Sequence, residues 1–195
     1  MKKQLSLLPK VSKSHGGSLA IGKRRSLRPL NPKQSHHVTL KSLHAVGGRC
    51  LYKHKKIIKY VLKKACNLYQ VKVYEFALCN NHIHLVIKGP DRESIQNFFR
   101  VFAGHTAQQI LKQCPMPAPQ IKKIGCLKNQ RKFWSYLVFS RIVSWGREFN
   151  TVIRYVQKNT LEALNLIAYQ PRKKRPSSKQ TVARLELVKR RFNTS

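Results

Sequence analysis

Cys79-Asn-Asn-His-Ile-His-Leu-Val-Ile-Lys-Gly-Pro90 is the stretch of sequence around which the rest of the chain is organised. The alternation of its side chains indicates a β-strand, whose core-facing positions are Ile83, Leu85 and Ile87. The opposite face carries His82 and His84, whose imidazoles are close enough to share a divalent metal ion. Because a lone strand histidine usually only completes the hydrogen bonding of a sheet, a metal site here requires a third ligand from elsewhere in the chain.

The charge of the chain points to a polyanionic partner. Its 195 residues contain 40 Lys and Arg but only 6 Asp and Glu, a formal net charge of +34. Such an excess destabilises a compact fold unless a polyanion neutralises it, and nucleic acid is the natural candidate. The sequence has no apolar run long enough to span a membrane and no basic amphipathic helix with a broad aromatic face. We therefore expect no membrane partner and a cytoplasmic, nucleoid-associated protein.

The scarcity of acids narrows the chemistry. One Asp and five scattered Glu are too few for a site in which several inward carboxylates hold two metal ions. A metal in this protein should therefore be bound by histidine and neutral oxygen donors. The five cysteines form no Cys-x-x-Cys pair, so we expect reduced thiols rather than a zinc ribbon or a disulfide framework.

Periodicity along the chain predicts a single α+β domain. Strand-like and helix-like patterns succeed one another in the order β-α-β-β-α-β, followed by one more helix. The predicted segments are residues 37–43, 53–67, 71–79, 82–88, 91–112, 133–143 and 147–168. This order is typical of the ferredoxin-like split β-α-β fold, an antiparallel sheet with helices on one face, to which a C-terminal helix is added. Asn80-Asn81 suits a hairpin turn, and Asp91 or Ser94 suits the N-cap of the second helix.

Both ends of the chain differ in composition from the predicted domain, which covers residues 35–169. Residues 1–34 lack a sustained period and predict a flexible basic arm, in which Arg24 and Arg25 would contact phosphates. A leader that only makes the chain soluble is the competing interpretation of this segment. Residues 170–195 form a second basic tail.

The last predicted helix carries a candidate nucleophile and a candidate third ligand. Tyr155 and Asn159 are four residues apart and therefore stand on the same helix face, beside the apolar stripe. From there a phenol can face the sheet edge from which His82 and His84 project. We predict that the two histidines and the amide oxygen of Asn159 bind Mg²⁺ or Mn²⁺. Tyr155 would be the attacking oxygen, which makes this the catalytic helix.

These groups suit the cleavage of a phosphodiester. A bound metal acts as a Lewis acid on the phosphate, and a positive site favours loss of the proton from a phenol, whose reference pKa is ~10. Attack would leave a 5′-phosphotyrosine and a free 3′-hydroxyl. Because the energy of the phosphodiester is kept, the hydroxyl of another strand end can reverse the step. Neither ATP nor a small-molecule cofactor is required.

The same residues resemble a known family. Three segments are similar to the motifs of single-tyrosine HUH transposases, especially the repeat-associated tyrosine transposases of the insertion-sequence 200 type: Asn81-His82-Ile83-His84, Phe133-Trp134…Ser140-Arg141 and Tyr155-Val156-Gln157-Lys158-Asn159. The resemblance covers roughly residues 36–168. It implies two metal-binding histidines, a nucleophilic tyrosine, a polar metal ligand four residues later, and single-stranded DNA with hairpins as the partner. Thr160, where that branch often has proline, and the connector over residues 113–131 depart from the pattern and put the DNA target in doubt.

Further side chains are candidate nucleic-acid contacts. Lys88 shares the strand face of the histidines, and Arg141 could meet a phosphate, although a solvated arginine is equally common in such a position. Trp134 and Tyr136 could stack on an unpaired base, although aromatic side chains more often pack in a core. His37 is interpreted as a strand-face residue near DNA.

Two interpretations from different classes remain open. One is an enzyme that cleaves and transfers single-stranded DNA, and the other is a catalytically inactive, domesticated protein that only binds nucleic acid. The intact set of two histidines, tyrosine and asparagine favours the enzyme. A ferredoxin-like RNA-binding domain ranks third because the strands lack a dense aromatic platform. Since one tyrosine holds one strand end, moving a DNA segment needs two, and a homodimer is a reasonable hypothesis.

Overall fold

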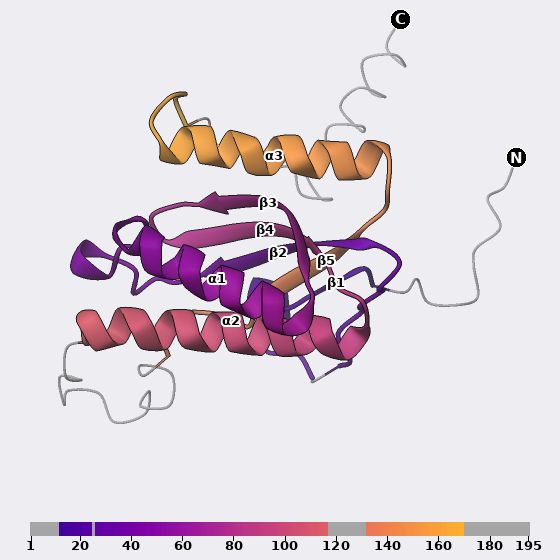
Figure 1. Cartoon of the computed structure of the whole chain (residues 1–195), viewed down its shortest axis with the longest axis horizontal. Helices are drawn as coiled ribbons and strands as arrows, with labels where there is room; N and C mark the ends of the chain where they lie inside the picture. Colours follow the sequence, from indigo (N-terminus) through magenta and orange to yellow (C-terminus); the bar gives the residue numbers. More distant parts are fainter. Residues whose placement is uncertain (1–11, 25, 117–131, 170–195) are drawn as a thin grey trace, which may run out of the picture.

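The computed structural model describes residues 12–24, 26–116 and 132–169 (Figure 1). Its elements are β1 (Ser14–His15), η1 (Gly17–Ala20), β2 (Ser35–Lys41), η2 (Gly47–Arg49), η3 (Leu51–His54), α1 (Lys55–Tyr69), β3 (Lys72–Leu78), β4 (His82–Lys88), α2 (Arg92–Gln113), β5 (Phe139–Val143) and α3 (Arg147–Ala163), where η denotes a short 3₁₀ helix. From β2 onward the strands and α-helices follow the order predicted from the sequence.

The five strands form one antiparallel sheet in the order β1-β5-β2-β4-β3. The turn between β3 and β4 is the predicted hairpin at Asn80-Asn81, closed by a bond from the backbone N–H of Cys79 to the carbonyl of His82 (3.0 Å). On β2, Thr39 pairs with His84 and Lys41 pairs with His82. Because directly opposed residues of an antiparallel pair lie on the same face, this register brings β2 side chains beside both histidines.

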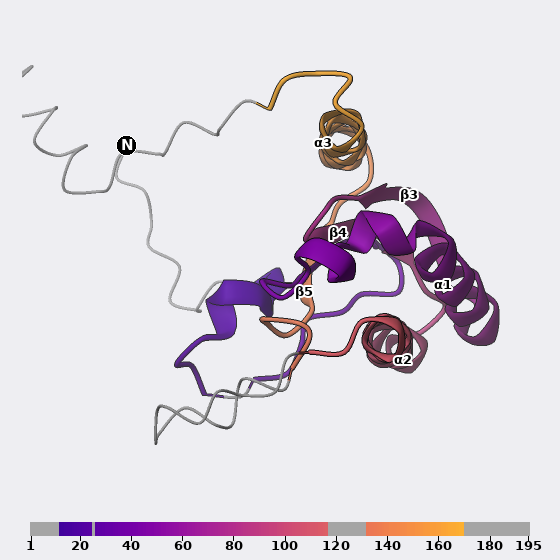
Figure 2. The same ribbon diagram turned by 90° about the vertical axis from the view of Figure 1, so that its left-hand side faces the viewer.

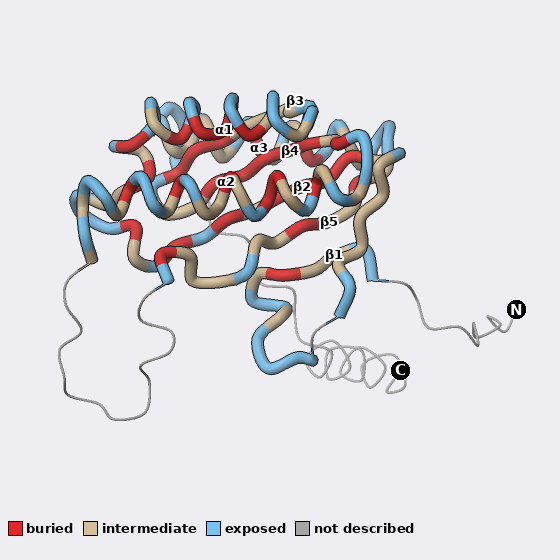
Figure 3. Tube along the Cα trace, turned by 60° about the horizontal axis from the view of Figure 1, so that its bottom comes forward, coloured by how far each residue is buried: buried red, intermediate tan, exposed pale blue. Residues whose placement is uncertain are grey.

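Helices cover both faces of the sheet: α1 and α2 lie on one face and α3 on the other (Figures 1 and 2). The larger core lies on the α1 and α2 side, and buried residues recur along both helices in Figure 3. The predicted apolar face of α2 is buried throughout and comprises Ile95, Phe98, Phe99, Phe102, Thr106 and Ile110. Asp91 is the N-cap of α2, accepting the backbone N–H of Ser94 at 2.8 Å. None of the helices described here is long and apolar enough to cross a membrane.

A second, smaller core holds α3 on the histidine-bearing face. It joins small aliphatic side chains of the sheet and the helix, namely Ala77, Val86, Val143, Val152 and Val156. Two further contacts join α3 to β3 and to the turn that follows it: Gln157 donates to a carboxylate oxygen of Glu75 at 2.9 Å, and the thiol of Cys79 lies 3.9 Å from the carbonyl of Asn159. Small side chains allow the helix to approach closely, so this packing sets where the α3 side chains meet the sheet.

Part of the predicted flexible arm belongs to the folded domain. β1 pairs with β5, and Gly16 next to it has a φ of +82° with so little room that a Cβ would collide with the carbonyl oxygen of Val138. Arg28 is also fixed, since its guanidinium donates to the carbonyl of Val138 (2.8 Å) and to the hydroxyl of Ser140 (2.6 Å). Burial lowers the pKa of Arg28 to about 10. The prediction of a flexible arm was therefore wrong for this part of the segment. Short backbone pairing and single buried side-chain contacts leave no periodic signal in the sequence.

The predicted strand over residues 133–143 is too long, because only Phe139–Val143 is a strand. Ahead of it, Phe133 is buried and the indole N–H of Trp134 donates to the carbonyl of Ala103 on α2 at 2.8 Å. The hydrogen bonding here is irregular: the backbone N–H of Ser135 donates to the carbonyl of Lys41 (3.0 Å), whereas its hydroxyl accepts the backbone N–H of Leu43 (2.6 Å). Anchoring of the aromatic pair to α2 therefore overrides the strand preference of the segment.

The last helix ends five residues before its predicted end, at Ala163. The following Asn165 has a φ of +57°, and its N–H bonds to the carbonyl of Glu162 while that of Leu166 bonds to Leu161. This is the Schellman arrangement, in which a left-handed residue satisfies the last helical carbonyls. As a result, Leu164 and Ile167, predicted on the apolar stripe, are exposed.

We expect Val156→Ala to lower the free energy of unfolding by about 1–3 kcal/mol, because it removes two fully buried methyl groups from the small core. The higher helix propensity of alanine offsets only part of this loss. Urea denaturation measures the change. The matched control is Leu161→Ala on the exposed side of α3, for which a change within about 0.5 kcal/mol is expected. Equal effects of the two substitutions would contradict the assigned packing.

Candidate active site

The histidine pair stands on β4 as its alternation predicted. The rings of His82 and His84 lie with their centroids 4.9 Å apart and nearly perpendicular to each other. His84 is buried, whereas His82 is partly exposed where the strand begins. The strand therefore presents two imidazoles of different accessibility at one end of the histidine-bearing face.

Neighbouring polar groups hold Nδ1 of both rings. Nδ1 of His82 lies 2.7 Å from Oδ1 of Asn81. Nδ1 of His84 lies 3.1 Å from the hydroxyl of Thr39 and 3.2 Å from Nε2 of His37. The His37 and His84 rings are also stacked, with centroids 5.3 Å apart. These contacts restrict the rotation of both imidazoles, and Oδ1 of Asn81 favours the tautomer of His82 that carries its proton on Nδ1.

The structure brings Tyr155 to this pair. Its ring meets His84 edge to face with centroids 5.4 Å apart, and it meets His37 in the same way at 5.8 Å. The ring also packs against the small core under α3, so helix packing and histidine contacts fix the same side chain. The predicted proximity of a phenol from the last helix to the strand histidines is therefore found in the structure.

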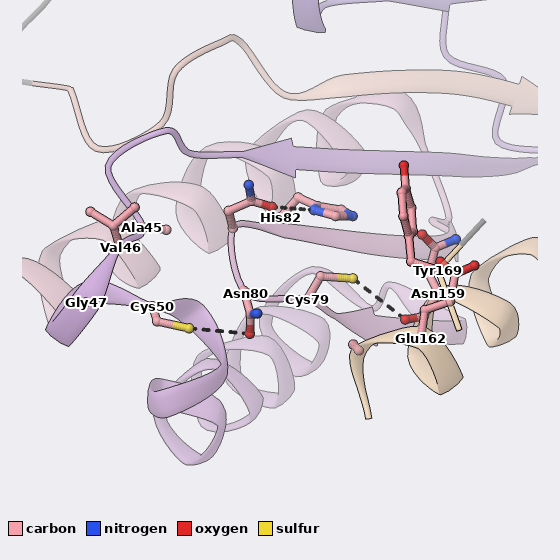
Figure 4. A pocket seen from close by; sticks show the side chains of 12 residues that line it. Ala45, Val46, Gly47, Cys50, Cys79, Asn80, His82, Asn159, Glu162 and Tyr169 are labelled. Atoms are coloured by element: carbon pink, nitrogen blue, oxygen red, sulfur yellow. Dashed lines mark hydrogen bonds between the residues drawn. The ribbon is translucent and has the colours of Figure 1, made fainter. Parts of the chain in front are cut away.

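A cleft of about 540 Å³ lies beside the pair, and both His82 and Asn159 line it (Figure 4). Its remaining walls come from the loop after β2, the β3–β4 turn, the end of α3, and Tyr169, which follows that helix. The side-chain amide of Asn159 donates to the backbone carbonyl of Tyr155 at 2.7 Å. With its NH₂ group held in this way, the side-chain oxygen of Asn159 is the atom that would serve as a ligand.

Two pKa shifts bear on the chemistry of the cleft. Burial, and then the nearby charge of Lys41, lower the pKa of His82, which favours the neutral imidazole that binds metals. Burial, and then the carboxylate of Glu162, raise the pKa of Cys79 to about 11. Cys79 therefore remains a thiol at neutral pH and is a poor nucleophile.

The residues present fit a divalent metal. Metal-binding histidines typically donate their second ring N–H to a protein acceptor. Oδ1 of Asn81 supplies such an acceptor for His82, and the hydroxyl of Thr39 would supply one for His84, so that each ring would bind through Nε2. In the described part of the chain, His, Cys, Asp and Glu form no group of three that could hold a metal, and the predicted set uses the amide oxygen of Asn159 as third donor. Imidazole and carbonyl oxygen together suit several divalent cations.

The other predicted contact residues lie apart from the pair. Lys88 is at the far end of β4, with its ammonium 5.7 Å from the centroid of the Trp145 ring. Arg141 pairs with His37 across the sheet and forms an ion pair with Glu148 at 3.3 Å. Trp134 packs against the larger core on the other face of the sheet. Arg24 is exposed on the N-terminal segment, and Arg25 lies outside the described residues.

Sequence reasoning missed the roles of His37 and Thr39. The alternation of β2 already placed both on one face of that strand, together with Lys41. What it could not supply was the register between β2 and β4, which sets Thr39 opposite His84. That register joins segments more than forty residues apart and leaves no local signal in the sequence.

Comparison with known proteins places the chain in a family. The family described as "Transposase IS200 like" matches residues 49–159, which is more than half of the chain and includes both histidines, Tyr155 and Asn159. The chain therefore belongs to the IS200-like transposases. No curated protein matches it.

One solved structure agrees with this fold. The chain is similar to a REP-associated tyrosine transposase bound to a REP hairpin, with 9% identity and a TM-score of 0.52, over 72% of this chain and 74% of that one. At this identity the likeness shows the fold alone. A protein from Deinococcus radiodurans R1 described as a "putative transposase" matches with 14% identity and a TM-score of 0.40, over 71% of this chain and 95% of that one.

We expect Thr39→Val to weaken Mn²⁺ binding by about 10-fold or more, because it removes the hydroxyl that holds Nδ1 of His84 while keeping the side-chain shape. Isothermal titration calorimetry with MnCl₂ measures the affinity without requiring activity. Thr151→Val on the exposed side of α3 serves as the matched control and should leave the affinity unchanged. Equal affinities for all three proteins would rule out this role of Thr39.

Proposed function

We propose that the protein is a metal-dependent transposase that cleaves and rejoins single-stranded DNA through a 5′-phosphotyrosine on Tyr155. The observation that supports this most directly is the edge-to-face contact of Tyr155 with His84 at 5.4 Å. It joins the one tyrosine of α3 to the strand that carries the histidine pair, within the segment that matches the transposase family. The buried packing of α3 supports a preorganised nucleophile rather than a mobile surface phenol.

The proposed reaction is one exchange of phosphate ester bonds. The phenolic oxygen of Tyr155 forms a bond to phosphorus as the bond from phosphorus to the 3′-oxygen of the preceding nucleotide breaks. The phenol loses its proton, and the departing 3′-oxygen takes one up. The downstream strand then carries its 5′-phosphate on the tyrosine. Attack by another 3′-hydroxyl reverses these changes and joins a new strand, so no external energy source is needed.

His82, His84 and Asn159 would hold the divalent cation, Mg²⁺ or Mn²⁺, which when bound supplies Lewis-acid polarisation of the phosphate. The chain contributes orientation of these ligands through Asn81, Thr39 and His37. The His37 ring also packs edge to face against Tyr155 at 5.8 Å, so the nucleophile and one ligand share a neighbour. A shared neighbour limits how far the two can move apart before attack.

The proposed substrate is single-stranded DNA that carries a hairpin. The relative of known structure with the matching fold is bound to a REP hairpin, and the charge of +34 supports a polyanionic partner for this chain. On α1 the solvent-facing side carries a continuous basic row, Lys55, Lys56, Lys59, Lys63 and Lys64. Like charges three or four residues apart destabilise a helix, so phosphates beside this row would relieve repulsion within the protein.

We expect wild-type protein to form a covalent adduct with labelled single-stranded hairpin DNA in the presence of Mg²⁺ or Mn²⁺, and Tyr155→Phe to reduce that adduct to background because the bond-forming oxygen is gone. Denaturing gel electrophoresis detects the adduct, and a chelator should also abolish it. Tyr60→Phe, which changes an exposed tyrosine on α1, is the matched control and should react as the wild type does.

A wild-type protein that forms no adduct with any hairpin DNA, yet binds it tightly and regardless of chelator, would overturn the enzymatic proposal. That result would favour the domesticated binding protein instead. Salt dependence does not separate the two, since both neutralise phosphates with the same lysines and arginines.

The proposed strand transfer needs two tyrosines, and we therefore propose a homodimer. Multi-angle light scattering of the protein with hairpin DNA should give a mass that contains two chains. A mass of one chain, both with and without DNA, would remove the dimer from the proposal while leaving cleavage by a single subunit intact.

A further inference from the structure

A second hollow lies on the histidine-bearing face, and it shares no described lining residue with the cleft at Asn159. It has a volume of about 270 Å³ and is formed by the N-terminal segment, β2 and the residues that lead into β5. Its lining residues are Gly17, Ser18, Leu19, Thr39, Lys41, Tyr136, Leu137 and Phe139. We propose that this hollow binds one unpaired base of the DNA strand, next to the phosphate that Tyr155 attacks.

The lining suits a flat heterocycle with a polar edge. Two aromatic rings, Tyr136 and Phe139, and the side chains of Leu19 and Leu137 provide apolar surface, while hydroxyl and ammonium groups of Thr39 and Lys41 provide hydrogen-bond partners. Unpaired bases stack on such aromatic side chains whatever their sequence, because every base has a flat π-face. The volume falls just below the range of about 300–1,000 Å³ typical of drug-sized ligands, which suits one base rather than a longer segment.

The wall contributed by the N-terminal segment is seated firmly on the sheet. The backbone N–H of Gly17 donates to the carbonyl of Leu137 at 2.9 Å. At this position a Cβ would lie 3.2 Å from the side chain of Phe139, so the glycine lets the segment rest on that ring. The positive φ of Gly17, +60°, is a second reason for glycine. The hollow is therefore part of the packed domain although the arm itself shows no periodic pattern.

Two residues connect the hollow to the candidate active site. The hydroxyl of Thr39 lines the hollow and lies 3.1 Å from Nδ1 of His84. Lys41 pairs with His82 in the sheet. Phe139, in turn, pairs with Thr39 and meets the ring of His37 at 6.4 Å. A base in the hollow would thus belong to a nucleotide adjacent to the phosphate held at the histidines.

The same geometry separates two aromatic residues of the segment before β5. Trp134 packs against the larger core and donates its indole N–H to Ala103, so it is committed to the opposite face. Tyr136, two residues later, lines the hollow instead. Of Trp134 and Tyr136, the two side chains that the sequence predicted as stacking partners for a base, the structure favours Tyr136.

The inference rests on the proposed function, so its test must give a result that does not depend on cleavage. The test is therefore a measurement of DNA binding. The protein carries Tyr155→Phe, and the probe is a fluorescent DNA hairpin with single-stranded flanks that contain all four bases. Each flanking nucleotide is replaced in turn by an abasic one, and fluorescence anisotropy at fixed salt gives the dissociation constants. If the wild type formed no covalent adduct, the proposed function would be contradicted, but this binding measurement would be unaffected.

We expect one flanking position at which the missing base weakens binding by about 5- to 100-fold, as the loss of one stacked base predicts. Adding Tyr136→Ala or Leu19→Ser should remove this sensitivity, whereas Tyr136→Phe should keep it. Tyr60→Ala, an exposed tyrosine on α1, is the control and should also keep it. The inference is overturned if no position is sensitive, or if Tyr136→Ala and Leu19→Ser proteins with an unchanged circular dichroism spectrum retain the sensitivity of their parent.

Discussion

The packing of α3 against the histidine-bearing face of the sheet is the interaction on which the candidate site depends. Val152 and Val156 of the helix meet Val86 of β4 and Val143 of β5 in a cluster of small aliphatic side chains. Because these side chains are small, the helix lies close to the sheet and its neighbouring Tyr155 reaches the rings of the histidines. A few methyl groups therefore determine whether Tyr155 lies beside the strand histidines.

Polar contacts within the sheet orient the histidine rings beside which helix packing places Tyr155. A pair of strand histidines alone would leave each imidazole free to rotate, but Asn81 and Thr39 hold Nδ1 of the two rings. His37 joins both parts of the site, since it contacts His84 through a ring nitrogen and Tyr155 through its ring edge. Within the described residues, the site is thus built from two strands, the turn between β3 and β4 and one helix, and it uses no carboxylate, which suits a chain so poor in acidic residues.

The features that could be predicted from the sequence are those set by local patterns. Alternation placed the histidines on one face of β4, the spacing of Tyr155 and Asn159 placed both on one side of α3, and Asp91 marked the start of α2. The β1 pairing, the anchoring of Arg28 and the contact of His37 with His84 could not be predicted, because each joins residues far apart in the chain. The end of α3 was misplaced because the apolar stripe continued beyond the left-handed turn at Asn165.

The two cores differ in size, so the helices packed on them differ in the free-energy cost of local unfolding. The sheet, α1 and α2 share the larger core, whereas α3 rests on a cluster with only five buried members among the described residues. Local unfolding follows such differences, because a unit with little buried apolar surface detaches at a smaller free-energy cost than the whole domain. Among the three described α-helices, the one that carries Tyr155 is therefore the least costly to release, and in hydrogen exchange its amides would lose protection before those of the central strands.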